Sequence, residues 1–129
     1  MFGILSDRRH FSQLSEAEVL ALAISAEEDD ARIYAGYAAR LRDDYPTTSE
    51  MFDGMVAEEN EHRARLIARF QARLGEVIPL IRREHVAGYY SRRPVWLSKT
   101  LSLERIREEA RKMELDAHHF YLAAAQRSS

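Results

Sequence analysis

The sequence predicts an all-α protein, an antiparallel helix bundle with three long helices and one short connector helix. Apolar residues recur at helical spacing along three long segments, and no segment shows the alternation of a half-buried strand. Five glycines, three prolines and 31% charged residues are typical of a helical protein. The 129 residues are enough for one domain with a proper core.

The first helix is predicted over residues 14 to about 44. Ser15 and Glu18 have the spacing of a capping box at its start, and Pro46 disfavours helix in the residue before it. The apolar residues at helical spacing between these signals are Val19, Leu20, Ala23, Ile24, Ala31, Tyr34, Ala38 and Leu41.

Three further helices are predicted. The second begins at an N-cap among the polar residues 47–49 and ends near Gly75, which suits a C-cap. A short connector helix is expected over 77–90, and Ser102 caps a last long helix that reaches the end of the chain. Because three long amphipathic helices leave an apolar face uncovered, we expect a fourth helix to be missing or to come from a partner chain.

The first and last helices form an internal repeat. A constant shift aligns Ser15 with Ser102, Glu27 with Glu114 and Tyr34 with Tyr121. If this reflects a duplication, the motif of the second helix should recur beyond residue 129. We therefore expect an N-terminal extension over 1–13 and a domain over 14–129 that is truncated at its C-terminus.

Three glutamates lie on the apolar faces of the long helices. Glu27, Glu59 and Glu114 each fall among apolar neighbours at helical spacing, and His62 follows Glu59 by one turn. An unpaired buried carboxylate costs several kcal/mol, so these acids must be neutralised, paired or metal-bound. Carboxylates from three helices with one imidazole suit a di-iron or di-manganese centre in a bundle core. Zinc is an alternative metal.

A metal-free interpretation stays open. Glu27 can pair with Arg63 or Arg65, and the chain would then be a helical dimerisation domain in which the other glutamates also pair with arginines, including Arg111. The formal net charge of −2 argues against a nucleic-acid partner. The absence of cysteine excludes disulfides and thiolate metal sites.

Four sequence motifs resemble the rubrerythrins, the bacterioferritins and the erythrin domain of membrane-bound ferritin. Glu27 with Tyr34 resembles their first ligand helix, residues 57–62 (AEENEH) resemble their second, and residues 114–121 (ELDAHHFY) resemble their third. The segments 77–83 and 93–97 resemble the erythrin domain in particular. The resemblance covers about residues 12–127 and implies a ferritin-like fold.

The resemblance implies roles for these residues. Iron ligands would be Glu27, Glu59, His62 and Glu114, with Asp30 as an additional carboxylate. Tyr34 and Tyr121 would donate hydrogen bonds to ligand carboxylates, or would only fill the amphipathic core. The catalytic residues would be Glu27, Glu59, Glu114 and Tyr34. His118 and His119 flank the apolar stripe, and we expect them to have solvent or structural roles.

The implied activity is ferroxidase-type oxidation of Fe(II) at a di-iron site. In membrane-bound ferritin such a domain precedes a membrane domain related to vacuolar iron transporters, which implies iron detoxification or export. A non-catalytic module that senses or collects iron is the alternative. No apolar run approaches the roughly 20 residues that span a bilayer, so we expect a cytoplasmic chain, on the cytosolic face of the inner membrane in its parent protein. We also expect a homodimer, since two chains can complete one site.

Overall fold

The computed structural model describes residues 9–82, 86–87 and 102–127. These residues form three long helices, namely α2 (Glu16–Leu41), α3 (Pro46–Leu74) and α4 (Leu103–Arg127). The short elements are β1 (Arg9–His10), the 3-10 turn η1 (Phe11–Gln13) and β2 (Val86–Ala87). Arg9 pairs with Val86 and His10 with Ala87 in a parallel register. The predicted all-α bundle is confirmed, since the described residues contain no strands besides β1 and β2, each of two residues.

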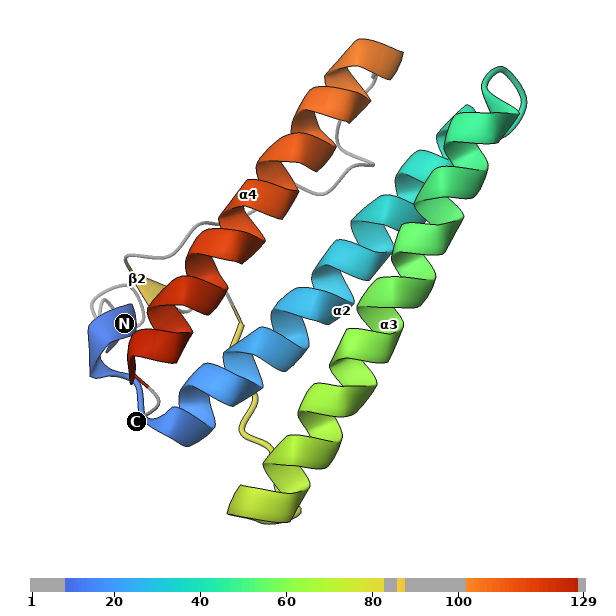
Figure 1. The fold of residues 1–129 in the computed structure, drawn as a ribbon. Coiled ribbons are helices and arrows are strands. Elements are labelled where there is room, and N and C mark those ends of the chain that lie inside the picture. Colours follow the sequence, from blue (N-terminus) through green and yellow to red (C-terminus); the bar gives the residue numbers. More distant parts are fainter. Residues whose placement is uncertain (1–8, 83–85, 88–101, 128–129) are drawn as a thin grey trace, which may run out of the picture.

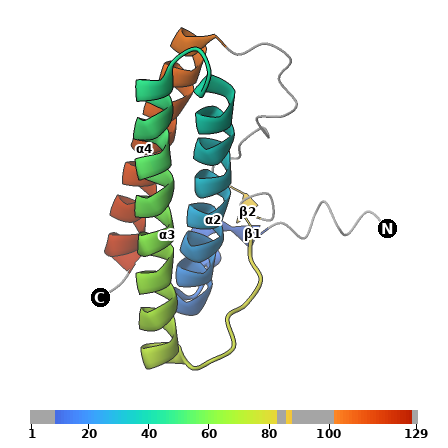
Figure 2. The same cartoon turned by 90° about the vertical axis from the view of Figure 1, so that its right-hand side faces the viewer.

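The three helices run side by side. α2 and α3 form an antiparallel hairpin, and α4 runs antiparallel to α2 along its other flank (Figure 1). In the view turned by 90°, the two strands and residues 75–82 lie on the side of α2 that faces away from α3 (Figure 2). No helix of the described residues is long and apolar enough to cross a membrane.

The capping box predicted at the start of the first helix is confirmed. The Ser15 hydroxyl accepts a hydrogen bond from the Glu18 amide at 3.1 Å, and the Ser15 amide donates to the Glu18 carboxylate at 2.9 Å. Two amides that would otherwise lack partners in the first turn of α2 are satisfied in this way.

Replacing Ser15 with alanine should lower the free energy of unfolding by about 1 kcal/mol, because the Glu18 amide loses its acceptor. Urea unfolding followed by circular dichroism measures the change. Ser15→Asp is the control, since aspartate also caps helices, and it should stay near the original stability. Equal stability of the alanine and aspartate variants would contradict the role of the cap.

The N-cap predicted for the second helix is wrong. α3 begins at Pro46, whose fixed φ suits the first helical position, so residues 47–49 lie inside the first turn. Ser49 is buried there, and its hydroxyl donates to the Ala38 carbonyl at 2.6 Å, which ties α3 to α2. The predicted C-cap is confirmed, because Gly75 ends α3 with φ at 106°.

The connector helix predicted over 77–90 is not found in its described part. Residues 77–82 are not helical, and Val86 belongs to a strand; residues 83–85 and 88–90 lie outside the described residues. Val77 and Leu80 are 87% and 80% exposed, so a helix at this position would have no surface against which to pack its apolar side chains. Without that burial a short helix is not stable.

Side-chain contacts hold the extended segment on α2. The Ser25 hydroxyl donates to the Ile81 carbonyl at 2.8 Å, and the Arg82 guanidinium donates to Asp29 at 3.0 Å. These two contacts bring the chain back along α2 toward β2.

Two apolar clusters form the core, with a polar layer between them. The first cluster contains Ile33, Tyr34, Tyr37, Ala38, Leu41, Phe52, Ile106, Ala110 and Met113. The second contains Leu14, Val19, Leu22, Ala23, Val86 and Phe120. Between them along the helices lie Glu27 and Asp30 on α2, and Glu59 and His62 on α3. The acidic side chains therefore lie in a polar layer that separates the two apolar clusters of the core.

Candidate metal centre

The polar layer draws its side chains from two helices. On α2, Glu27 and Asp30 are both 5% exposed. On α3, Glu59 and His62 are three residues apart, as Glu27 and Asp30 are, and this spacing places each pair on one helix face. The pairing of α2 with α3 brings the two faces together.

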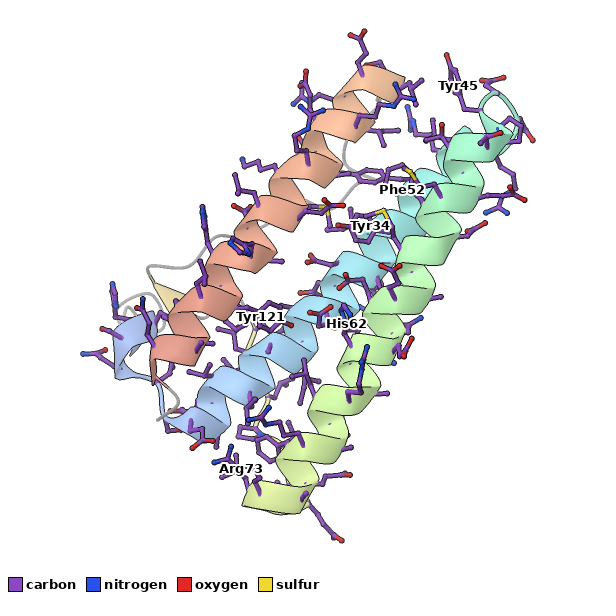
Figure 3. The ribbon with its side chains drawn as sticks, viewed as in Figure 1. Tyr34, Tyr45, Phe52, His62, Arg73 and Tyr121 are labelled. Carbon is purple, nitrogen blue, oxygen red and sulfur yellow. The ribbon has the colours of Figure 1, made fainter. Side chains whose placement is uncertain are left out.

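Three of these residues converge. Glu27, Glu59 and His62 each offer one ligand atom, and the three atoms all lie within 4.8 Å of one another. Nδ1 of His62 lies 3.9 Å from Oε2 of Glu27. Figure 3 shows His62 reaching from α3 toward α2, with Tyr121 of α4 approaching from the opposite side. Two carboxylates and an imidazole suit a hard or borderline divalent cation.

Glu27 is held from one side and unsatisfied on the other. The Tyr121 hydroxyl donates a hydrogen bond to Oε1 of Glu27. Oε2 is buried and receives no hydrogen bond from the described residues. A buried carboxylate oxygen without a donor is costly, and a bound cation removes that cost. The donor set therefore fits a metal ion.

The acids of this layer do not all ionise. Burial raises the pKa of Glu59 to about 9, with further increases from the hydrogen bond that its protonated form makes with Glu27 and from the negative charges of Glu27, Asp30 and Glu58. Without a cation, the site therefore keeps a proton near neutral pH. A cation that binds here takes the place of that proton.

The predicted pairing of Glu27 with Arg63 or Arg65 is wrong. Arg63 pairs with Glu28 at 3.7 Å, and Arg65 pairs with Glu61 at 3.7 Å. Both partners lie outside the converging group. The imidazole of His62 is the basic group nearest to Glu27 in the ion pairs of the described residues.

Glu114 does not lie where its apolar neighbours suggested. It is exposed on α4 and is not a member of the converging group. The expectation of burial is wrong, because the described residues leave the Glu114 side chain exposed. Glu114 lies seven residues before Tyr121, hence on the same flank of α4. Its role as a ligand stays a prediction.

The remaining predicted residues lie at the Glu/His cluster, in the apolar core or at the protein surface. Asp30 is buried beside the cluster, and its charge acts on Glu59. Tyr34 is 2% exposed in the first apolar cluster, where its ring stacks on Phe52 at 5.9 Å. Tyr121 donates its predicted hydrogen bond to Glu27, whose role as a ligand stays a prediction. His118 and His119 are exposed, as expected.

A family model named rubrerythrin matches residues 18–129. The chain belongs to the rubrerythrin family. The match spans α2, α3 and α4, so it includes Glu27, Glu59, His62 and Glu114. The rubrerythrin assignment agrees with the Glu/His cluster in indicating iron binding. Searches of curated proteins and of solved structures found no significant match.

Replacing Tyr121 with phenylalanine should weaken metal binding by about 10- to 100-fold, the usual effect of losing a group that orients a ligand. The ring and its packing on Phe120 are kept, while Glu27 loses the hydrogen bond to Oε1. Calorimetric titration with Zn²⁺ measures the change. Tyr45→Phe is the control because Tyr45 is exposed before α3, and an equal effect in both variants would contradict this role.

Proposed function

We propose that this rubrerythrin-family chain binds iron through Glu27, Glu59 and His62. The observation that carries the proposal is the convergence of three ligand atoms within 4.8 Å beside a buried carboxylate oxygen that lacks a donor. Glu27 is oriented by Tyr121, Glu59 exchanges its proton for the cation, and His62 supplies a nitrogen ligand. Iron is favoured over softer metals by the carboxylate oxygens.

The proposed reaction is oxidation of Fe(II), the substrate, to Fe(III), with dioxygen or peroxide as electron acceptor. The two carboxylates favour the product because it carries one more positive charge than the substrate. The imidazole of His62 is 49% exposed, so one side of the site is open to a small oxidant. Buried Glu27 and Asp30 keep the opposite side negative.

A di-iron centre needs more ligands than the three that converge. We propose that Glu114 joins on the exposed side, with Asp30 as an additional carboxylate. The remaining ligands would come from a second copy in a homodimer or from a fourth helix. The position of Glu114 on the same flank of α4 as Tyr121 supports its inclusion.

Anaerobic titration with Fe(II), followed by exposure to air, tests the proposal. A saturating stoichiometry and an oxidised-iron absorption band that Glu59→Ala abolishes would support it. Glu61→Gln is the matched control, since Glu61 lies on α3 but is exposed and pairs with Arg65. Absence of a stoichiometric band, or a band unchanged in Glu59→Ala, would overturn the ferroxidase proposal.

One observation favours a second candidate, a module that collects or senses iron without turnover. Within the described residues, the converging group contains three ligands, which suit one ion. Such a module would bind Fe(II) but would not pass through repeated oxidation cycles. Oxygen consumption per bound iron separates the two functions. A metal-free dimerisation domain would retain no iron, manganese or zinc after loading.

The resemblance of segments 77–83 and 93–97 to the erythrin domain supports a further proposal about the parent protein. In it, this domain would be fused to, or associated with, a membrane iron transporter at the cytosolic face, and iron from the site would be exported. Co-purification of iron efflux activity with the parent protein, and its loss on Glu59→Ala, would test this role.

A further inference from the structure

A groove opens beside the candidate metal centre. It has a volume of about 320 Å³, and its walls are His62, Arg65, Leu66 and Arg69 of α3 and Tyr121 of α4. Two of these residues belong to the centre itself, since His62 is in the converging group and Tyr121 holds Glu27. A molecule in this groove therefore lies next to any bound metal.

The α3 wall of the groove is basic. Arg65 and Arg69 follow His62 by three and seven residues, which places all three along one flank of the helix. Arg65 makes a 3.7 Å ion pair with Glu61 in which both side chains are mostly exposed. Arg69 makes no ion pair with the described residues. By contrast Arg73, one turn further on, is engaged by Glu16 at 2.9 Å.

We propose that this groove binds an oxyanion, a phosphate or a carboxylate, held by Arg65 and Arg69 beside the metal ion. The inference rests on the proposed function, because the metal is what makes the position favourable. A guanidinium presents paired N–H donors that match the two oxygens of such a group. A cation held by Glu27, Glu59 and His62 keeps open positions, and the exposed imidazole lies on the groove side.

Binding of the oxyanion depends on the metal. Without a cation, the negative charges of Glu27, Asp30 and Glu58 repel an anion in the groove. A bound divalent cation offsets part of this negative charge next to the groove, where the arginines hold the oxyanion. The coupling is reciprocal, so the oxyanion also tightens metal binding.

The adjoining groove extends the site toward the far end of the bundle. It shares Leu66, Arg69 and Tyr121 with the first and continues over Val19, Ala23 and Phe120. Because this extension is apolar, a second protein chain could also cover it, so the oxyanion in the groove can come from either of two sources. It is either a free ion or an acidic side chain of a second copy of this chain, whose apolar neighbours would cover the extension.

Co(II) is the probe for the test, because its visible spectrum reports a change of ligands without any turnover. Inorganic phosphate is added at constant ionic strength to the Co(II)-loaded chain and to the metal-free chain. We expect phosphate to perturb the Co(II) bands and to bind at least about tenfold more tightly to the loaded chain. Arg69→Gln should weaken this binding by about 10- to 100-fold, the usual range for a charge-assisted contact.

The control is Arg42→Gln, which removes the same charge at the turn between α2 and α3 and leaves the groove intact. A dilution series without phosphate separates the two sources. Co(II) affinity that rises with chain concentration, and ceases to do so in Arg69→Gln, supports a side chain of a second copy. Phosphate binding that is equal in Arg69→Gln and Arg42→Gln, without concentration dependence, overturns this inference alone. Failure of the chain to bind Co(II) overturns the proposed function as well.

Discussion

Replacing Glu59 with alanine should abolish tight metal binding by this chain. Glu59 supplies one of three ligand atoms that lie within 4.8 Å of one another, and it is the one carboxylate that α3 contributes to the group. Loss of a group that only orients a ligand costs 10- to 100-fold in affinity, so removal of the ligand itself should cost more than about 100-fold. Calorimetric titration with Zn²⁺ or anaerobic Fe(II) measures the loss.

The control for this experiment is chosen on the same helix. Glu61 lies two residues from Glu59, but it is exposed and its partner is Arg65, so Glu61→Gln removes one charge without touching the cluster. Its metal affinity should stay within a few-fold of that of the original chain. Glu59 is half-buried, and its truncation leaves the two apolar clusters intact, so the variant should keep its helical circular dichroism. Equal metal affinity in Glu59→Ala and Glu61→Gln would show that the cluster is not the metal site.

The parts of the fold that follow from local chemistry were predictable. Ser15 with Glu18 marks the start of α2, and Gly75 marks the end of α3, because caps depend on a few adjacent residues. The start of α3 was wrongly predicted because two signals lie next to each other: Pro46, which suits the first helical position, and the polar residues 47–49, which suit an N-cap. The connector helix over 77–90 was wrongly predicted for another reason, since the residues of a short segment do not reveal whether its apolar side chains have a surface to pack against.

The candidate site divides in the same way. Glu27, Glu59 and His62 were found because a carboxylate on an apolar stripe is informative wherever the stripe is buried. Glu114 has the same local sequence features, yet it is exposed, because its burial depends on what covers the flank of α4. No role was predicted for Arg69. Its spacing of seven residues from His62 was the available signal, but only the position of α4 turns that flank into a groove.

The stability of the metal-free chain should fall as the pH rises from about 4.5 to about 9. The raised pKa of Glu59, about 9 in the folded chain against 4.5 for its ordinary value, means that the folded state keeps a proton that the unfolded state releases. Below pH 4.5 Glu59 is protonated in both the folded and the unfolded state, and its contribution to the free energy of unfolding is fully present. Above pH 9 Glu59 is ionised in both states, and the stability does not fall further on its account. Because water screens a half-buried carboxyl, we expect a loss on the order of 1–2 kcal/mol rather than the larger value that the full shift would imply.

Glu59→Gln isolates this effect. The amide keeps the shape of the protonated acid but does not ionise, so the metal-free variant should be more stable than the original chain at pH 8 and equal to it near pH 4.5. Urea unfolding at both pH values, with a chelator present, measures the difference, and Glu61→Gln should change neither. A divalent cation should reverse the order at pH 8, since it stabilises only a chain that keeps its carboxylate ligand. If the original chain and Glu59→Gln had the same stability at pH 8 without metal, Glu59 would be an ordinary solvated acid.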